Sequence, residues 1–362
     1  WNIMWLDTVM LLPLLALGIH SLVTEGRFRL YTLILALSVA ANYYIGFIVC
    51  IFTAIYFFVL CIVCRIGFRK FLLRFGEIAL FSVLGLLMTA PITFTAYEAL
   101  MRAYYVPEQF DDAVKLYHSF QEIITQVLAF IPPTYSDGLP NLYCGFFCFL
   151  LLYVFLRARG IRIREKILYL LFLAFLIVSC NVNLLNYIWH GLHYPNMLPY
   201  RFSFLFCFLL VVMAYKAFRF LSELRWFDLI IMFAMYLAFL IYSVPILETY
   251  ELGNLIAAGN FIAFAVYFVI LAVYLLKRVD RRKINIAISA VILVEFSIYM
   301  IITAEQVGSS SRSSYINKEE EMSVFLEAIE ENDEEAFYRT EFSTWYILNA
   351  APLYDYNGVA QF

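Results

Sequence analysis

The sequence predicts an all-α polytopic membrane protein with about ten transmembrane helices. Hydrophobic residues make up 64% of the 362 residues, charged residues only 15%, and the mean hydropathy is +0.81. A soluble domain is about half apolar and about a quarter charged. The composition therefore excludes a soluble enzyme and a disordered chain. The net charge of −3 also provides no basic field that would attract a nucleic acid.

Ten apolar stretches, most near the length of about 20 residues that crosses a bilayer, are the predicted spans. They lie near residues 4–22, 30–45, 46–63, 77–97, 142–156, 167–182, 202–218, 227–247, 254–276 and 284–303. The 35 residues from Leu30 to Cys64 are too long for one relaxed span. We divide them at Asn42-Tyr43-Tyr44-Ile45-Gly46, because Asn and Gly interrupt helices. We also expect Tyr43 and Tyr44 to line an outer cavity.

Basic residues orient these spans. Of the 25 Lys and Arg residues, 19 lie in five connectors, and ten spans place all five connectors on one side, which the positive-inside rule makes cytoplasmic. The connectors hold Arg27 and Arg29; Arg65, Arg69, Lys70 and Arg74; Arg157, Arg159, Arg162, Arg164 and Lys166; Lys216, Arg219 and Arg225; and Lys277, Arg278, Arg281, Arg282 and Lys283. The opposite side then carries the outer loops 96–142 and 181–201, and we expect a further span upstream of Trp1.

The domain organisation follows from the same pattern. Residues 1–303 form the transmembrane domain, and residues 304–362 are predicted to begin a soluble domain outside the cytoplasm. In this tail, a helical pattern covers Glu319–Ala328 and is followed by an acidic run that we interpret as a solvated helix face or linker. The aromatic stretch from Phe337 to Phe362 resembles the first strands of a domain.

The sequence contains no strong metal or nucleotide motif. The seven cysteines lie in or beside apolar stretches, and CxxC occurs once, at Cys61 and Cys64. We interpret them as small apolar residues and not as a disulfide framework or zinc site. A phosphate-binding GxxxxGK loop is absent. No cofactor is certain; a divalent metal ion stays open, because the carboxylates of Glu108, Asp111 and Asp112 could bind one or could begin a solvated helix.

The outer loop 181–201 gathers the polar groups most suited to chemistry. Arg201 begins an apolar stretch near the membrane surface, where its guanidinium can hold a phosphate. The imidazoles of His190 and His193 could donate to the same phosphate or move a proton, and Asn196 lies between these residues in sequence. The alternative is an interfacial anchor, since Trp, Tyr and Arg gather at headgroup depth without any catalytic role.

Carboxylates near the outer surface are candidate catalytic bases. Asp7 lies close to the outer end of the first span, where a charge is costly, although capping of the helix N-terminus would also explain it. Asp137 lies in a turn that enters the fifth span, and turn formation does not account for its carboxylate. Glu295 lies in the middle of the last span, so we expect it to be buried against a tyrosine hydroxyl or to be protonated.

Several stretches resemble the YfhO-type family of bacterial multi-pass membrane proteins. They are NIMWLDTVMLLPLLALG, ANYYIGFIVCIF, DGLPNLYCG, NLLNYIWHGLHYPNMLPYRFSFLF, AFYRTEF and LYDYNGVAQF, and they occur in the family's order along the whole chain. Family members are longer at both ends. We therefore expect the chain to lack the first spans, with the first outer loop and its acidic residue, and most of the C-terminal domain.

The resemblance implies a GT-C-like glycosyltransferase in the bacterial cell membrane with its active face outside the cytoplasm. Such an enzyme passes a sugar from a polyprenyl-phosphate carrier to a cell-envelope glycopolymer such as lipoteichoic acid. As members of the family's motifs, Asp7 and Asp137 are the candidate catalytic residues. Arg201, His190, His193 and Asn196 are the candidates for binding the donor phosphate. A flippase or transporter for a lipid-linked sugar, and a non-catalytic scaffold for envelope assembly, are the alternatives.

Overall fold

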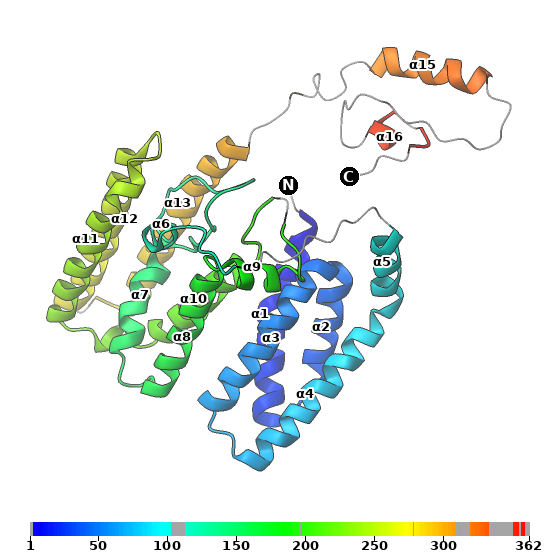
Figure 1. Ribbon diagram of the computed structural model, residues 1–362. Helices are drawn as coiled ribbons and strands as arrows, with labels where there is room; N and C mark the ends of the chain where they lie inside the picture. Colours follow the sequence, from blue (N-terminus) through cyan, green and yellow to red (C-terminus); the bar gives the residue numbers. More distant parts are fainter. Residues whose placement is uncertain are drawn as a thin grey trace. The chain divides into compact units, whose positions relative to one another are not determined.

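The computed structural model describes residues 3–102, 113–195, 197–277, 279–307, 311, 319–332, 350–354 and 356–358. Every regular element in these residues is a helix, as predicted. A single isolated antiparallel bridge pairs Leu116 with Val182. The chain divides into two compact units, Trp1–Gln306 and Val307–Phe362, which are described separately below (Figure 1).

Thirteen α-helices are described in the first unit. They are α1 (Ile3–Glu25), α2 (Arg29–Ala41), α3 (Tyr43–Val63), α4 (Phe68–Met88), α5 (Ala90–Arg102), α6 (Phe120–Thr125), α7 (Phe146–Arg157), α8 (Ile163–Ser179), α9 (Asn183–Trp189), α10 (Ser203–Phe218), α11 (Trp226–Leu247), α12 (Gly253–Lys277) and α13 (Arg281–Val307). A short 3₁₀ helix, η1 (Leu221–Glu223), connects α10 to α11.

Each of the ten predicted apolar stretches contains helix, but the helices differ in length, and the stretch 77–97 is divided at Thr89 between α4 and α5. Six helices, α1, α3, α4, α11, α12 and α13, are long and apolar enough to cross a membrane. The apolar helices α2, α7 and α10 are shorter, with 13, 12 and 16 residues, and α8 has 17. At 1.5 Å per residue a helix of this length covers about 18–25 Å, less than the hydrocarbon thickness of about 30 Å. Flanking non-helical backbone at that depth must then be shielded by protein.

The predicted division between α2 and α3 is confirmed. Asn42 has extended backbone (φ −157°, ψ 107°), and its side chain accepts a hydrogen bond of 2.9 Å from the Ile45 amide, which caps α3. Gly46 lets the two helices approach, because a Cβ atom there would lie 2.9 Å from the Val39 Cα. Close contacts at small residues are typical of membrane helices.

The predicted start of the fourth span, near residue 77, is wrong. Helix α4 begins at Phe68, so Arg69, Lys70 and Arg74 lie in its first two turns and not in a connector. The Lys70 Nζ donates to the Thr24 carbonyl at the end of α1 (2.9 Å). The helix therefore begins before its apolar stretch, because long basic side chains can extend from a helix to polar groups at the end of a neighbour.

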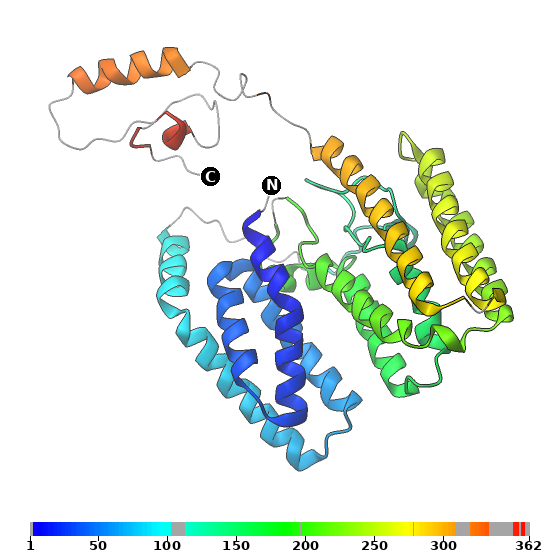
Figure 2. The ribbon, with the colours of Figure 1, turned by 180° about the vertical axis from the view of Figure 1, so that it is seen from behind.

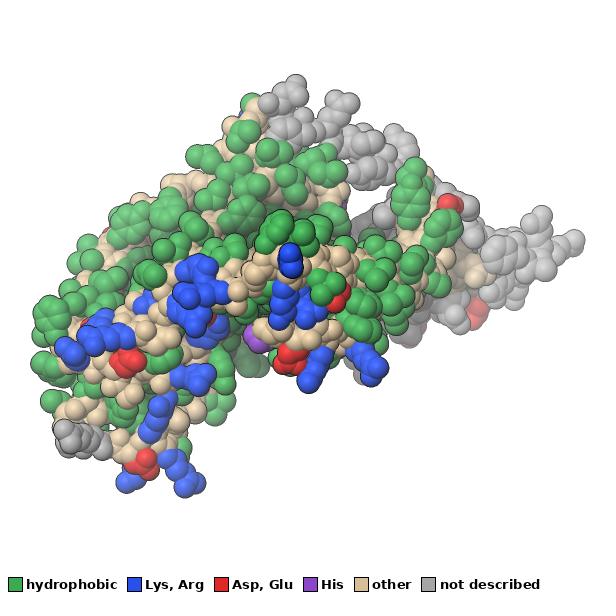
Figure 3. Space-filling view, turned by 90° about the horizontal axis from the view of Figure 1, so that it is seen from below, with side chains coloured by type: hydrophobic (Ala, Val, Ile, Leu, Met, Phe, Trp, Pro, Cys, Tyr) green, Lys and Arg blue, Asp and Glu red, His purple; other side chains and the backbone are tan. Residues whose placement is uncertain are grey.

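Two groups of helices build the first unit. Helices α1, α2, α3 and α4 pack on one another, α7 and α8 pack on α10, α11 pairs with α12, and α3 contacts α8 between the groups (Figure 2). The five basic connectors lie at the same end of this unit, the lower end in Figure 1. Viewed from below, that face shows a concentration of Lys and Arg side chains (Figure 3).

The second unit contains α15 (Glu319–Asn332) and α16 (Ala350–Leu353). The predicted helix at Glu319–Ala328 is confirmed and extends to Asn332, with Met322 and Leu326 buried. Residues 337–349, which include much of the aromatic stretch expected to form strands, lie outside the described residues.

Candidate functional site

A small crevice of about 110 Å³ lies at the end of the first unit opposite the basic connectors. Its wall comes from the start of α1, the turn before α7 and the connector between α9 and α10 (Figure 1). The described residues that line it are Trp5, Thr134, Leu139, Pro140, Asn141, Leu198, Pro199, Tyr200, Arg201 and Ser203. Among them Arg201 alone carries a charge, and we name this feature the Arg201 crevice.

Hydrogen bonds hold the turn before α7 against the connector between α9 and α10. The Asn141 side chain closes the turn 134–141 by accepting from the Thr134 amide and donating to the Thr134 carbonyl, both at 2.9 Å. The Leu198 amide then donates to the Ser136 carbonyl at 2.9 Å. The turn before α7 is thereby attached to the connector that carries Arg201.

The Arg201 guanidinium is held between aromatic rings. Its Nε and Nη2 donate to the Met197 carbonyl (3.2 and 2.9 Å). Its central carbon lies 5.1 Å from the Trp5 ring centroid and 5.0 Å from that of Tyr44, within the range of cation–π attraction. No carboxylate forms an ion pair with Arg201 among the described residues. Because a guanidinium has five N–H donors, this uncompensated cation retains donors for an anion.

His190 is buried and uncharged. Its ring is fully buried, and Nδ1 donates to the Asn186 carbonyl at 2.7 Å. The other ring nitrogen, Nε2, then carries a lone pair that has no hydrogen-bond partner among the described residues. Burial lowers the pKa of His190 to about 4, and the nearby Arg201 charge acts in the same direction. As an uncharged buried ring His190 supplies no positive charge for a phosphate; its bond to Asn186 holds the connector in place.

The other predicted residues of the outer loop differ in position. His193 is half-buried, with its ring centroid 5.8 Å from that of Tyr44. Neither Tyr43 nor Tyr44 is among the described residues that line the Arg201 crevice, so their expected place in an outer cavity stays a prediction. Asn196 lies outside the described residues. Leu192 and Leu198 have positive φ angles of 63° and 51°, which are uncommon for such side chains. Strained backbone of this kind often accompanies functional sites.

The two predicted catalytic carboxylates are not equivalent. Asp137 is exposed in the turn 134–141, which contributes four residues to the Arg201 crevice, but Asp137 is not itself among the described residues that line it. Asp7 is exposed on α1. Two residues along a helix turn a side chain by about 200°, so Asp7 faces away from Trp5 and from the crevice. The structure therefore places Asp137 in a turn that borders the Arg201 crevice, whereas Asp7 faces away from it.

Two asparagines that the sequence analysis did not select connect the long outer loops. The Asn181 side chain accepts from the His118 amide (2.9 Å), and the Asn183 side chain accepts from the Lys115 amide (2.9 Å) and donates to the Ala113 carbonyl (3.0 Å). The signal was the Asn-Val-Asn sequence at the start of the loop, since asparagine side chains often bond to backbone outside helices.

The suggested divalent metal site is not described. Glu108, Asp111 and Asp112 fall in residues 103–112, outside the described part of the chain. Within the described part, no group of three or more His, Cys, Asp or Glu residues is placed to hold a metal ion.

Comparison with known proteins agrees with this membrane architecture. The sequence model of the family described as bacterial membrane protein YfhO matches residues 1–362. No curated protein and no solved structure matches the chain.

Proposed function

The chain belongs to the YfhO family of bacterial membrane proteins, and from this premise we propose that it is a membrane glycosyltransferase of the cell envelope. The proposed reaction moves a sugar from a polyprenyl-phosphate carrier to a cell-envelope glycopolymer, such as lipoteichoic acid, on the extracytoplasmic face. The multi-pass membrane location follows from the family and from the long apolar helices.

One observation carries the proposal: the uncompensated guanidinium of Arg201 at the end of the bundle opposite the basic connectors. A phosphate attached to a lipid remains near the membrane surface, and we infer the same depth for this cation because it directly precedes the apolar helix α10. Guanidinium groups bind phosphate oxygens in pairs. The rings of Trp5 and Tyr44 restrict the guanidinium, so little conformational freedom is lost when the phosphate binds.

The proposed chemistry divides between Arg201 and Asp137. The bond between the sugar C1 and the phosphate oxygen breaks, its electron pair stays on the phosphate, and a new bond forms between C1 and an acceptor hydroxyl oxygen. Arg201 stabilises the charge that develops on the departing phosphate. Asp137, exposed in the turn that borders the crevice, accepts the proton of the acceptor hydroxyl. In this proposal His193 assists at the phosphate, and His190 keeps the connector in position through its bond to Asn186.

The test is sugar transfer from a labelled polyprenyl-phosphate donor, measured with the protein in membranes. Because Arg201 acts on charge that develops in the transition state, Arg201→Ala should lower the rate by about a hundredfold or more. Arg201→Lys should retain part of the activity, since a lysine keeps the charge but not the paired donors.

Arg164→Ala is the matched control. Arg164 is also half-buried but lies at the basic end of the unit, so its loss should leave the rate unchanged. Full activity of correctly folded Arg201→Ala would remove Arg201 from the site. Movement of labelled carrier across the membrane with no new glycosidic bond would replace the proposed enzyme with a transporter.

A further inference from the structure

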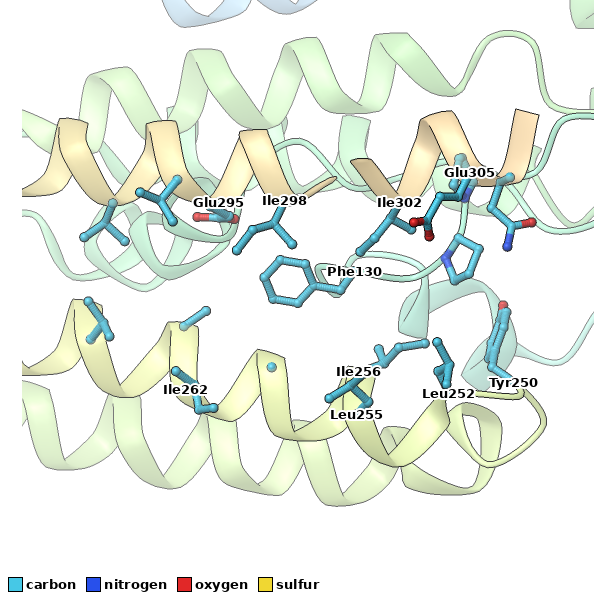
Figure 4. Close-up of a pocket in the computed structure, with 18 of the residues that line it drawn as sticks. Phe130, Tyr250, Leu252, Leu255, Ile256, Ile262, Glu295, Ile298, Ile302 and Glu305 are labelled. Carbon is cyan, nitrogen blue, oxygen red and sulfur yellow. The ribbon is translucent and has the colours of Figure 1, made fainter. Parts of the chain in front are cut away.

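A large groove separates helices α12 and α13. Its volume is about 1020 Å³, and its side chains come from both helices, from residues 250–252 before α12 and from residues 130–133 (Figure 4). We name it the α12–α13 groove. Both helices are long enough to cross the membrane, so the groove lies at the depth of the lipid chains.

The ring of Phe130, held in a fixed position, keeps α12 and α13 apart and so forms the groove. The side chain of Asn260, which is fully buried, accepts from the Ala129 amide (2.9 Å) and donates to the Ala129 carbonyl (2.7 Å). The next residue, Phe130, has a φ of 66°, which turns its ring between the two helices (Figure 4). A Cβ atom on Gly259 would lie 3.0 Å from this ring. The glycine and the two hydrogen bonds therefore keep Phe130 where it holds the helices apart.

The groove has the shape of a site for an extended hydrocarbon chain. On α13 its lining runs from Ala290 to Gln306, which is about 24 Å at 1.5 Å per residue, close to the bilayer hydrocarbon thickness of about 30 Å. The walls between these points are mostly aliphatic, and they include Leu255, Ile262 and Ile298. At the depth of the lipid chains, such a surface packs against methylene groups through van der Waals contact.

The charges along the groove are all negative. At mid-depth, the buried Glu295 carboxylate accepts from the hydroxyls of Tyr143 and Tyr267 and from the Phe146 amide, none of which is a cation. At the mouth are Glu251 and Glu305, together with Gln306 and Tyr250. No Lys, Arg or His is among the described residues that line the groove.

The negative charges along the groove determine which lipid head group can bind beside it. Carboxylates repel a phosphate, and the groove offers no cation to compensate it. Carboxylates and amides do accept hydrogen bonds from hydroxyl groups. We propose that the α12–α13 groove binds the chain of a lipid with an uncharged, hydroxyl-bearing head, of the sugar-diacylglycerol class. The assignment of this lipid as the carrier of the sugar acceptor rests on the proposed function, with the phosphate-linked donor in the Arg201 crevice.

Binding is tested by photo-crosslinking in phosphatidylcholine nanodiscs. The probe is glucosyl-diacylglycerol with a diazirine on one acyl chain. The expected labelled peptides come from α12 and α13. Unlabelled glucosyl-diacylglycerol should compete, whereas phosphatidylglycerol and polyprenyl phosphate should not. Equal competition by the phosphate lipids would overturn the proposal.

Matched tryptophan substitutions test the location. Val266 and Val294 line the groove, whereas Val269 and Leu293 are exposed on the same helices outside it. Val266→Trp and Val294→Trp should lower labelling by on the order of tenfold, because the indole displaces a few methylenes of the bound chain. Val269→Trp and Leu293→Trp should leave labelling unchanged; an equal loss in all four would mean that no groove site exists.

The head specificity is tested at the mouth. The double substitution Glu251→Gln and Glu305→Gln removes the repulsion and should let phosphatidylglycerol compete, whereas Glu248→Gln, a nearby exposed residue outside the groove, should not. Unchanged specificity in the double variant would refute the charge argument. Arg201→Ala should retain normal labelling, so the loss of sugar transfer in this variant and the loss of groove binding are separate results.

Discussion

At the residue scale, two buried ionisable groups are accommodated by different means. Glu295 receives three neutral hydrogen-bond donors, so its acceptors are satisfied at membrane depth. His190 has one partner and a second nitrogen with none among the described residues, so its charged form is disfavoured. For Glu295 we therefore expect the stability of the fold to depend on these hydrogen bonds. For His190 we expect the stability to depend on pH.

Glu295→Ala should strongly destabilise the protein. It would leave the hydroxyls of Tyr143 and Tyr267 and the Phe146 amide without their acceptor, and each unsatisfied buried group costs about 1–3 kcal/mol. The midpoint of thermal unfolding in detergent measures the loss. Glu295→Gln, which keeps one carbonyl oxygen, should fall between alanine and the native chain. Glu305→Gln, at an exposed position with no hydrogen bond among the described contacts, is the control. Equal midpoints for all variants would contradict this role.

His190 should make the folded protein less stable in acid. Its pKa is about 4 in the folded state, below the ordinary value of 6.5, so between these values the unfolded chain binds a proton that the folded chain does not. The stabilisation is complete above pH 6.5 and is lost as the pH falls toward 4, by about 3 kcal/mol in total.

The measurement is the unfolding midpoint of the native protein and of His190→Asn at about pH 7 and about pH 5. The asparagine can still donate to the Asn186 carbonyl but does not titrate. The native protein should lose more stability than the variant over this interval. The same loss in both would assign the acid sensitivity to other groups.

The predictability of the site also differs from residue to residue. Arg201 and Asp137 can be recognised as candidate site residues from sequence, because a charge beside an apolar stretch is visible there. The tyrosine partner expected for Glu295 is present. Trp5 was not selected as a partner of Arg201, because the two residues meet only through the packing of α1 beside the α9–α10 connector. The buried, neutral state of His190 likewise depends on Asn186 and on neighbouring rings, which local sequence does not specify.

At the scale of elements, close helix contacts depend on individual glycines. A Cβ atom on Gly18 would lie 2.7 Å from the backbone of Tyr31, whereas none of the surrounding atoms lies within 4 Å of such a Cβ on Gly76. Gly18→Ala should therefore separate α1 from α2 and lower the unfolding midpoint. Gly76→Ala, in the interior of α4, should leave it unchanged or raise it, because alanine favours helix by up to about 1 kcal/mol. Equal effects would mean that the α1–α2 contact does not limit stability.

Helix boundaries were predictable where charge and turn chemistry agreed. The division at Asn42 followed from the length of the apolar stretch, from its Asn and Gly residues and from the side on which the connectors must lie. Hydropathy alone predicts too late a start for α4, because it marks where a helix enters lipid and not where its hydrogen bonds begin. Lys70 illustrates the difference. Its backbone belongs to α4, while its ammonium group reaches the Thr24 carbonyl at the end of α1, so the helix includes basic residues that precede its apolar stretch.

At the scale of the whole transmembrane unit, the two ends differ in charge, and so do the Arg201 crevice and the α12–α13 groove. The basic connectors occupy one end, and the Arg201 crevice lies at the other. The α12–α13 groove contains carboxylates but no described basic residue. A phosphate-linked donor and an uncharged acceptor lipid would then be directed to different places by charge alone, although both enter from the same bilayer.

This arrangement requires the crevice to face away from the cytoplasm. In a background with the seven native cysteines replaced, we expect Asp137→Cys to react with a membrane-impermeant maleimide in intact cells, because this exposed turn lies at the end opposite the basic connectors. Arg164→Cys, at the basic end, should react only after permeabilisation, because the positive-inside rule places that end in the cytoplasm. The reverse pattern would invert the topology. It would put the donor phosphate and the acceptor polymer on the wrong side of the membrane for the proposed transfer.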